Sequence, residues 1–374
     1  IMGAGTNRVN RYTVRKATCG LANYLIDQFG DQGKAKGVVI AYDSRLNSRE
    51  FALEAALVLC AAGIKAFLFD ELQPTPVLSF AVRHLGCIGG IVITASHNPK
   101  EYNGYKVYNQ HGYQAVPKEA DQIITYVHQV KDLASIPVMD EAAAREQAQS
   151  VLGNSRAKAD LRVVYTPLHG TGFAPVRAVL SGGGFENLFV VEEQQIPDGH
   201  FPTVNTPNPE EPDALAMAVE KAKAAAADVV IGTDPDCDRV GAAVKHQGQY
   251  VFLTGNQIGA LLVNFVLSQR KDQLTPKSTL IKTIVTNELG STIARSYGLQ
   301  VFETLTGFKF IGEKITKFEQ TGSHEFVLGY EESHGYLVGT HARDKDAVVA
   351  SMLICEMAAF YLQQGKTLVD VLNE

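Results

Sequence analysis

Short apolar runs alternate with stretches of helical periodicity along the whole chain. The apolar runs are bounded by turn residues, which predicts buried strands. These predicted strands cover residues 37–42, 64–69, 88–93, 161–165, 188–191, 229–231, 279–285, 299–303 and 326–328. Apolar residues at helical spacing, closed by glycine, predict helices at residues 15–29, 50–62, 173–180, 290–297 and 344–364. Strands that alternate with helices predict an α/β fold with largely parallel or mixed sheets.

The alternation runs through three rounds, and each round ends with an apolar strand that leads into a polar loop. The three polar loops carry Ser96, Asp234 and Glu331. Sites in α/β sheets gather beyond the carboxyl ends of the strands. We therefore expect three consecutive α/β domains, each a mixed sheet sandwiched by helices, with an active-site cleft between them.

Composition suggests where the domains begin and end. The Ala-, Glu- and Gln-rich segment Met139–Ser155 predicts a helix that links the first two rounds, and the Pro- and Asn-rich segment Pro197–Pro212 predicts a long loop. The polar segment Gln269–Ser278 opens the third round. The predicted domains are therefore residues 1–155, 156–268 and 269–374.

Composition also excludes several classes of protein. The chain of 374 residues is 45% hydrophobic and 20% charged, with a formal net charge of −6. Without a basic run, this balance argues against nucleic acid as a partner. No apolar run reaches the roughly 18 residues of a membrane span, so we expect no membrane partner. Five scattered cysteines without a C-x-x-C pair indicate reduced thiols, a cytoplasmic location and no thiolate zinc site.

The strongest chemical signal is the sequence Asp-Pro-Asp-Cys-Asp-Arg at residues 234–239. Pro235 disfavours a helix, and alternate positions of an extended chain point the same way, so three carboxylates can converge. Converging carboxylates repel each other unless a cation neutralises them, and an all-oxygen set favours Mg²⁺, Mn²⁺ or Ca²⁺ over zinc. An EF-hand is excluded, because Arg239 and Lys245 stand where it needs glycine and glutamate. A solvated acidic loop is the remaining alternative.

A second signal lies in the loop at residues 94–99, Thr-Ala-Ser-His-Asn-Pro. It places the hydroxyl of Ser96 at the end of a buried strand, with His97 beside it and Lys106 close behind. The loop is not a nucleophile elbow, because the glycines on both sides of the serine are missing. Its alternative is a strand-to-turn cap in which Ser96 bonds its own backbone.

The third loop, Glu331–His334, supplies hydrogen-bond partners suited to sugar hydroxyls, although it also fits an ordinary surface loop. Lys309 and Lys345 add cations in the same region. His334 is more simply explained as a structural histidine. His169, which precedes Gly170-Thr171-Gly172, is likewise explained by a tight turn.

Together, three segments resemble the signature loops of the α-D-phosphohexomutases, the family that includes phosphoglucomutase and phosphomannomutase. The segments are Thr94–Pro99, Gly232–Arg239 and Gly329–Ser333, and they occur in the family's order. Residues 3–10 and 165–172 resemble the long bacterial branch of the family. The resemblance spans nearly the whole chain.

The resemblance implies interconversion of hexose 1-phosphate and hexose 6-phosphate, with glucose as the first choice of hexose and mannose as the second. Ser96 would be a phosphoserine that passes its phosphoryl group to the sugar and takes back the other phosphate from a bound 1,6-bisphosphate. Lys106 would be the general acid/base, and His97 would position the phosphoryl group. One Mg²⁺ would be held by Asp234, Asp236, Asp238 and an oxygen of phosphorylated Ser96. The residues implied for substrate are Glu331, Ser333, Lys309, Lys345 and Arg239. Glucose 1,6-bisphosphate would be the intermediate and activator.

The chain departs from this family in two places. An Arg-Gly pair expected just before Ile1 is missing, and so is a C-terminal domain whose Ser/Thr-Gly-rich loop anchors the non-reacting phosphate. We expect a fragment that holds domains one to three and lacks the fourth, phosphate-binding domain. Because anchoring of remote groups supplies much of an enzyme's rate, we expect the fragment to be far less active than the intact protein.

Three other functions stay open at this point. A phosphopentomutase or another sugar phosphomutase would use the same chemistry on a different sugar. A non-catalytic phosphosugar-binding protein would need neither the serine nor three metal carboxylates. A metal-dependent phosphatase would release free phosphate without forming an isomer.

Overall fold

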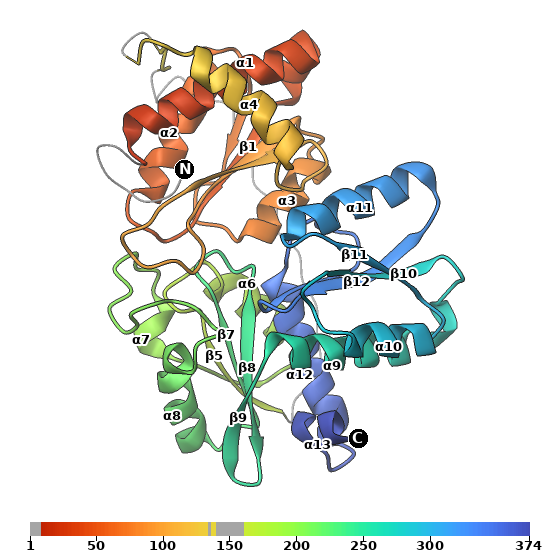
Figure 1. Cartoon of the computed structure of the whole chain (residues 1–374). Coiled ribbons are helices and arrows are strands. Elements are labelled where there is room, and N and C mark those ends of the chain that lie inside the picture. The colour runs from red at the N-terminus through yellow and green to blue at the C-terminus, as the bar shows by residue number, and fades with distance from the viewer. Residues whose placement is uncertain (1–8, 134–135, 140–160) are drawn as a thin grey trace.

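Three mixed sheets, each flanked by helices, follow one another along the chain (Figure 1). The computed structural model describes residues 9–133, 136–139 and 161–374. In Figure 1 the first domain lies at the top, the second at the lower left and the third at the right. The predicted architecture of three α/β domains is therefore confirmed.

The first domain has a four-stranded sheet in the order β2-β1-β3-β4. Strands β1, β2 and β3 are parallel, and β4 runs antiparallel to β3. Its elements are α1 (Arg11–Lys36), β1 (Val38–Tyr42), α2 (Ser48–Ala61), β2 (Ala66–Leu68), α3 (Thr75–His84), β3 (Gly89–Ile93), β4 (Tyr105–Asn109) and α4 (Pro117–Gln129).

The second domain has a five-stranded sheet in the order β6-β5-β7-β8-β9. Strands β5, β6 and β7 are parallel, while β8 and β9 are antiparallel to their neighbours. Its elements are β5 (Arg162–Thr166), α6 (Phe173–Gly182), β6 (Asn187–Val190), α7 (Glu192–Gln195), η1 (Pro212–Leu215), α8 (Ala216–Ala225), β7 (Val229–Thr233), β8 (Val240–His246) and β9 (Gln249–Leu253).

The third domain repeats the pattern with the strand order β11-β10-β12-β13. Only β13 is antiparallel in this sheet. The elements from here to the end of the chain are α9 (Gly255–Gln269), η2 (Lys271–Gln273), β10 (Ser278–Thr283), α10 (Leu289–Ser296), β11 (Gln300–Thr304), α11 (Phe308–Thr321), β12 (Glu325–Glu331), β13 (Gly335–Val338), α12 (Ala347–Leu362) and α13 (Leu368–Asn373).

The three polar loops occupy the same topological position in the three sheets. Each loop connects an inner strand, which has a parallel neighbour, to an antiparallel strand: β3 to β4, β7 to β8 and β12 to β13. The loops therefore leave the carboxyl ends of β3, β7 and β12, as the strand–loop pattern predicts.

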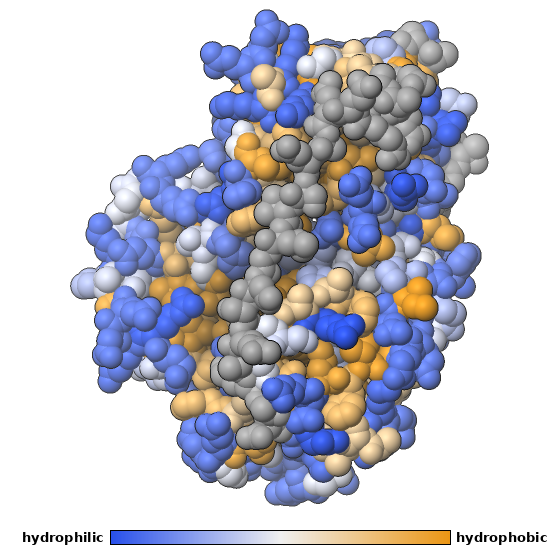
Figure 2. Space-filling view, turned by 180° about the vertical axis from the view of Figure 1, so that it is seen from behind, coloured by the Kyte–Doolittle hydropathy of each residue, from blue (hydrophilic) through white to orange (hydrophobic). Residues whose placement is uncertain are grey.

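The first domain has its own hydrophobic cores, whereas the second and third share one. A single cluster of buried residues includes Val163 of β5, Leu280 of β10 and Ile354 of α12. Not all apolar residues are buried: the back of the molecule is mixed in hydropathy, with hydrophilic residues prevailing at its margins (Figure 2). Within the residues that the structure describes, no helix has the length and apolarity needed to cross a membrane.

Gly30 is expected to end the first helix, and it does interrupt the helical backbone: with φ 58° and ψ −154° it forms a kink, beyond which a second helical stretch of α1 continues to Lys36. The chain beyond the kink is held by packing, because Gly33 lies against Ile88. The long loop predicted over Pro197–Pro212 is confirmed up to η1.

The predicted helix Met139–Ser155 lies outside the described residues, except for Met139. The boundary after residue 155 lies there too. The boundary after residue 268 falls at the end of α9. Along the sequence, α9 follows the last strand of the second sheet and precedes the first strand of the third. The domain boundaries therefore stay a prediction.

Candidate active site

Ser96 lies in the loop after β3, and its side chain is directed at the second domain. Its hydroxyl donates a hydrogen bond of 2.7 Å to Oδ2 of Asp234, and Nδ1 of His97 lies 3.3 Å from the same hydroxyl. The residue is buried and has φ 52°, which is uncommon outside glycine. Such a backbone persists only where its surroundings impose it, and it is frequent at functional sites.

The surroundings that impose this conformation include Thr94 and Asp43. The hydroxyl of Thr94 accepts a 2.7 Å hydrogen bond from the amide of Ser96 and donates one of 2.6 Å to Asp43. The second carboxylate oxygen of Asp43 accepts from the hydroxyl of Ser48 and from the amide of Arg45. A hydrogen-bonded cap thus exists, but it uses the hydroxyl of Thr94 and leaves that of Ser96 free to face Asp234.

The carboxylates of the second loop converge as the sequence predicts. One oxygen from each residue lies within 4.8 Å of the others, and all three side chains are buried; the residues are Asp234, Asp236 and Asp238. Asp234 also accepts hydrogen bonds from the backbone amides of Asp238 (3.1 Å) and Arg239 (3.0 Å), which fold the loop back on itself. This is a buried turn and not a solvated acidic loop.

Two lysines from the other domains neutralise this cluster in part. Nζ of Lys106, on β4, lies 2.9 Å from Asp236, and Nζ of Lys345, before α12, lies 3.0 Å from Asp238. The first domain adds Thr75, whose hydroxyl donates to Asp236 and whose amide bonds the carbonyl of the same residue. All three domains therefore meet at the carboxylates.

The cluster fits a divalent cation bound through oxygen. Oδ1 of Asp236 and Oδ1 of Asp238 are buried and have no hydrogen-bond partner. Buried polar atoms without partners are rare, and each calls for an explanation. Three buried carboxylate oxygens in close proximity are the donor set that Mg²⁺ prefers.

The pKa values of these groups show the same need for positive charge. Burial, followed by repulsion from Asp236 and Asp238, raises the pKa of Asp234 well above its usual value. Burial also raises the pKa of Asp238, with a further contribution from Asp236. Burial opposes ionisation of Asp236, yet Lys106 leads the interactions that bring the pKa of this residue below its usual value. A bound cation would favour the ionised form of all three.

The two basic groups beside Ser96 differ in charge. Burial, followed by the positive charge of Arg239, lowers the pKa of His97 to about 4, so its imidazole is neutral near pH 7. Burial by itself would lower the pKa of Lys106, but Asp236 and Asp238 outweigh it and raise the pKa. Lys106 is therefore an ammonium ion next to the carboxylates.

The third loop presents Glu331 in a buried position. Its carboxylate accepts a 2.8 Å hydrogen bond from the amide of Gly307, and burial raises its pKa. Ser333 is half-buried in the same loop. His334 is buried with Nδ1 3.3 Å from the carbonyl of Val240, which agrees with a structural histidine.

Arg239 and Lys309 differ in their relation to the cluster. Nη1 of Arg239 binds Glu210 at 2.6 Å, while its buried Nε has no hydrogen-bond partner. Nζ of Lys309 lies over the ring of Phe310, 5.5 Å from its centroid. The described contacts join Lys345, but not Lys309, to the carboxylates.

Some neighbours of the site were missed by sequence reasoning. Thr75 and Glu210 stand in ordinary helix-start and Pro-rich contexts, which carry no signal of a functional site. The pair Asp43 and Arg45 does follow an apolar strand, which is the same signal that marked Ser96. The same signal therefore points to Asp43 and Arg45 as neighbours of the site.

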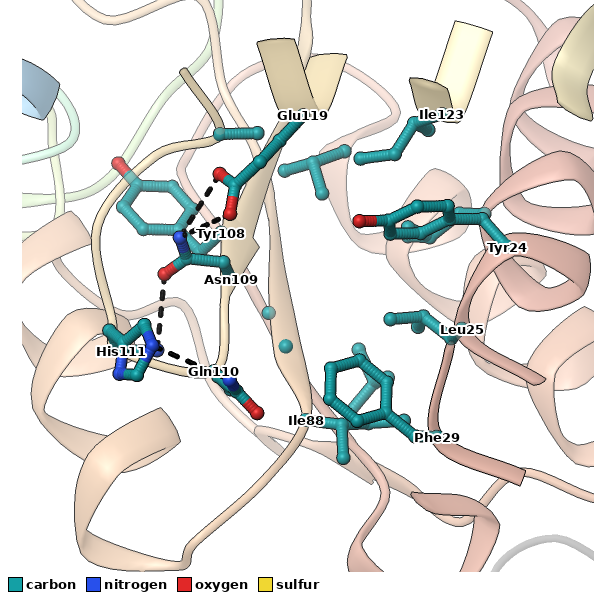
Figure 3. Close-up of a pocket in the computed structure, with 16 residues that line it drawn as sticks. Tyr24, Leu25, Phe29, Ile88, Tyr108, Asn109, Gln110, His111, Glu119 and Ile123 are labelled. Carbon is teal, nitrogen blue, oxygen red and sulfur yellow. Dashed lines mark hydrogen bonds between the residues drawn. The ribbon is translucent and has the colours of Figure 1, made fainter. Parts of the chain in front are cut away.

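A separate cavity lies at the other end of β3. It is lined by α1, by Tyr108 and Asn109 of β4, and by Glu119 and Ile123 of α4 (Figure 3). Its volume of about 60 Å³ is well below the roughly 300 Å³ at which ligand pockets begin. Asn109 Nδ2 donates to both oxygens of Glu119, so these two polar side chains of the cavity wall pair with each other. This cavity is not part of the candidate site.

Comparison with known proteins agrees with this geometry. Residues 1–134, 142–248 and 254–374 match α/β/α domains I, II and III of phosphoglucomutase/phosphomannomutase. A phosphoglucomutase of Staphylococcus saprophyticus is 36% identical over 390 aligned residues, covering 100% of this chain and 70% of that protein. A phosphoglucomutase of Staphylococcus aureus strain USA300 is 38% identical over 388 aligned residues, covering 100% of this chain and 69% of that protein.

Solved structures show the same fold. A phosphoglucomutase/phosphomannomutase family protein from Burkholderia thailandensis superposes with a TM-score of 0.78 at 21% identity, covering 100% of this chain and 77% of that one. Paramecium parafusin, a phosphoglucomutase, superposes with a TM-score of 0.72 at 20% identity, covering 96% of this chain and 70% of that one. The chain belongs to the phosphoglucomutase/phosphomannomutase family and is an enzyme of that family.

Proposed function

We propose that this protein is a phosphohexomutase that interconverts glucose 1-phosphate and glucose 6-phosphate through a phosphoserine at Ser96. The hydrogen bond from Ser96 to Asp234 carries the proposal, because it places a hydroxyl directly against the three convergent carboxylates. The relatives named phosphoglucomutase, at 36% and 38% identity, support glucose as the hexose.

In the proposed reaction, phosphorylated Ser96 gives its phosphoryl group to the 6-hydroxyl of glucose 1-phosphate. The product is glucose 1,6-bisphosphate, and by way of the acid/base group the departing oxygen of Ser96 receives a proton in place of the one that the 6-hydroxyl loses. The 1-phosphoryl group is then transferred to Ser96, which leaves glucose 6-phosphate and restores the phosphoserine. The bisphosphate is therefore both the intermediate and the activator of a dephosphorylated enzyme.

Asp234, Asp236 and Asp238 would hold one Mg²⁺, with an oxygen of phosphorylated Ser96 as a further ligand. Such an ion supplies charge neutralisation for the transferring phosphoryl group. Support comes from the two partnerless oxygens of the cluster. In addition, an Aspergillus fumigatus N-acetylphosphoglucosamine mutase, which shares the fold with a TM-score of 0.52 at 14% identity, has been solved in complex with GlcNAc-6P and magnesium.

Lys106 and His97 would act on the transferring group from the first domain. The raised pKa of Lys106 favours the acid half of the role, in which the ammonium gives a proton to the departing oxygen. Its 2.9 Å contact with Asp236 sets its position. His97, as a neutral imidazole 3.3 Å from the serine hydroxyl, would position the phosphoryl group.

The substrate would be held mainly by the third domain. Glu331 and Ser333 would bind sugar hydroxyls in both orientations of the intermediate. Lys345 and Arg239 lie beside the carboxylates and would contact phosphate or sugar oxygens. Lys309 would contact the substrate only after its side chain leaves the ring of Phe310.

A coupled assay tests the substrate. The protein is given glucose 1-phosphate, mannose 1-phosphate or ribose 1-phosphate with Mg²⁺ and a trace of the matching bisphosphate. We expect isomer formation with glucose 1-phosphate to be faster than with the other two. A preference for ribose 1-phosphate would identify a phosphopentomutase, and release of free phosphate without isomer would identify a phosphatase.

We also propose a cytoplasmic location, which the five reduced cysteines support.

A further inference from the structure

Arg45 holds the backbone of the loop that carries Ser96. Its guanidinium donates to four carbonyl groups: those of Ser96 (2.5 Å) and Asn98 through Nη2, and those of Pro99 and Tyr102 (2.9 Å each) through Nη1. Arg45 is almost completely buried. One side chain therefore fixes both ends of the turn between β3 and β4.

Within the first domain Nε of Arg45 also lies 3.4 Å from Oδ2 of Asp43, and the second domain adds a contact of a different kind. The ring of Phe201 lies against Arg45, with 5.1 Å between the guanidinium carbon and the ring centroid. Phe201 is 2% exposed and has φ 47°, which is a genuine outlier for a bulky residue. Two residues earlier, Gly199 is so close to the first domain that a Cβ atom there would lie 2.5 Å from the amide nitrogen of Leu46.

The segment that carries Phe201, residues 196–203, is itself fixed at both ends. Nδ1 of the buried His169 lies 3.1 Å from the carbonyl of Ile196, and Nε2 lies 2.9 Å from the hydroxyl of Thr203. Because a carbonyl oxygen can only accept, Nδ1 of His169 donates to Ile196. This segment is therefore a rigid arm of the second domain that reaches the first.

We propose that Phe201 is a positioning residue, which acts through Arg45 to hold the Ser96 loop in register with the carboxylates of the second domain. The same domain that carries Asp234 thereby also sets the position of the serine. The face of an aromatic ring attracts a desolvated guanidinium more strongly than an exposed one, and a misplacement of about 1 Å is enough to slow a reaction that depends on alignment. This inference rests on the proposed role of Ser96.

Two variants, Phe201→Met and Phe201→Leu, remove the ring while they keep an apolar side chain. The matched control is Phe189→Met, because Phe189 of the same domain also stacks on an arginine, Arg162, at 5.0 Å. The first readout is amide hydrogen exchange of residues 95–102, which needs no catalysis. The second is the single-turnover rate at which Ser96 accepts phosphate from glucose 1,6-bisphosphate, together with kcat and KM.

We expect both Phe201 variants to speed exchange in residues 95–102 and to lower the transfer rate and kcat about tenfold, with KM changed less than about twofold. Phe189→Met should leave exchange in residues 95–102 and the transfer rate unchanged. In an Arg45→Lys background, Phe201→Met should add little, because the two residues act through one contact.

The proposal is overturned if exchange in residues 95–102 is the same in the Phe201 and Phe189 variants. It is also overturned if Phe201→Met keeps its full effect in the Arg45→Lys background. If wild-type protein accepts no phosphate, the proposed function fails, while the exchange measurement still decides whether Phe201 fixes the loop.

Discussion

The hydroxyl of Ser96 lies 2.7 Å from the carboxylate of Asp234, although 138 residues separate the two in sequence. The contact joins the loop after β3 to the loop after β7, so it depends on the packing of the first domain against the second. Lys345 adds the third domain through its 3.0 Å contact with Asp238. The site is therefore complete only when all three domains are in place.

Removing one carboxylate of the cluster should strongly reduce stabilisation of the protein by magnesium. A ligand at 100 times its Kd stabilises the folded state by about 2.7 kcal/mol, so Mg²⁺ should raise the melting temperature of the wild-type protein. Asp236→Asn should lose most of this shift, since Asp236 supplies one of the two partnerless oxygens. Asp31→Asn, at a side chain that is 92% exposed, is the control and should keep it. An equal shift in both variants would count against metal binding at the cluster.

Lys345 should be needed for stability chiefly when no metal is bound. Its Nζ pairs with Asp238 in a nearly buried position, and removal of one partner of such a pair costs roughly 3 kcal/mol. Lys345→Met should therefore lower the free energy of unfolding measured by urea titration in EDTA. Saturating Mg²⁺ should restore part of the loss, because the ion replaces the missing positive charge.

Lys309→Met is the matched control for that experiment, because Lys309 lies in the same domain and contacts Phe310 instead of the carboxylates. It should change the unfolding free energy little in either condition. If Lys345→Met were as stable as Lys309→Met in EDTA, the neutralising role of Lys345 would be wrong.

His97 should stay neutral throughout the physiological range. Burial, and then Arg239, lower its pKa to about 4 from a usual value of 6.5. NMR of the imidazole in wild-type protein and in His97→Gln, which assigns the signal, should show no titration of His97 between pH 5.5 and 8. In the urea-unfolded chain all histidines should titrate near pH 6.5. A midpoint above pH 6 for His97 in the folded protein would refute this assignment.

The same shift has a consequence for stability. Between the folded and unfolded pKa values of His97, the unfolded chain binds more protons than the folded one. The contribution of His97 to the free energy of unfolding is therefore complete above about pH 6.5 and is lost as the pH falls toward 4. His97→Gln should flatten the pH dependence of the unfolding free energy in this window.

The parts of the site that lie in one contiguous segment were predictable from sequence. Spacing alone brought together the carboxylates of residues 234–238, and the strand before Ser96 placed its hydroxyl at the edge of the sheet. The parallel strands were also predictable from single segments of the sequence, because each of them contains a continuous apolar run.

What sequence could not supply comes from contacts between distant segments. Arg45 and Phe201 meet only because a loop of the second domain packs on the first. The antiparallel strands β4, β8, β9 and β13 were not predicted, and in β4 the polar residues Lys106 and Asn109 interrupt the apolar positions. Glycine has weak helix propensity, which is why Gly30 interrupts α1, but its sequence context gives no sign that a further helical stretch follows the kink.

The central claim is that Ser96 carries the phosphoryl group, and intact mass measures this directly. The protein is incubated with glucose 1,6-bisphosphate and Mg²⁺, with Ser96→Ala and EDTA as controls. We predict a single addition of about 80 Da, one phosphoryl group, that is absent in both controls. No addition to the wild-type protein, or an addition that persists in Ser96→Ala, would contradict the account.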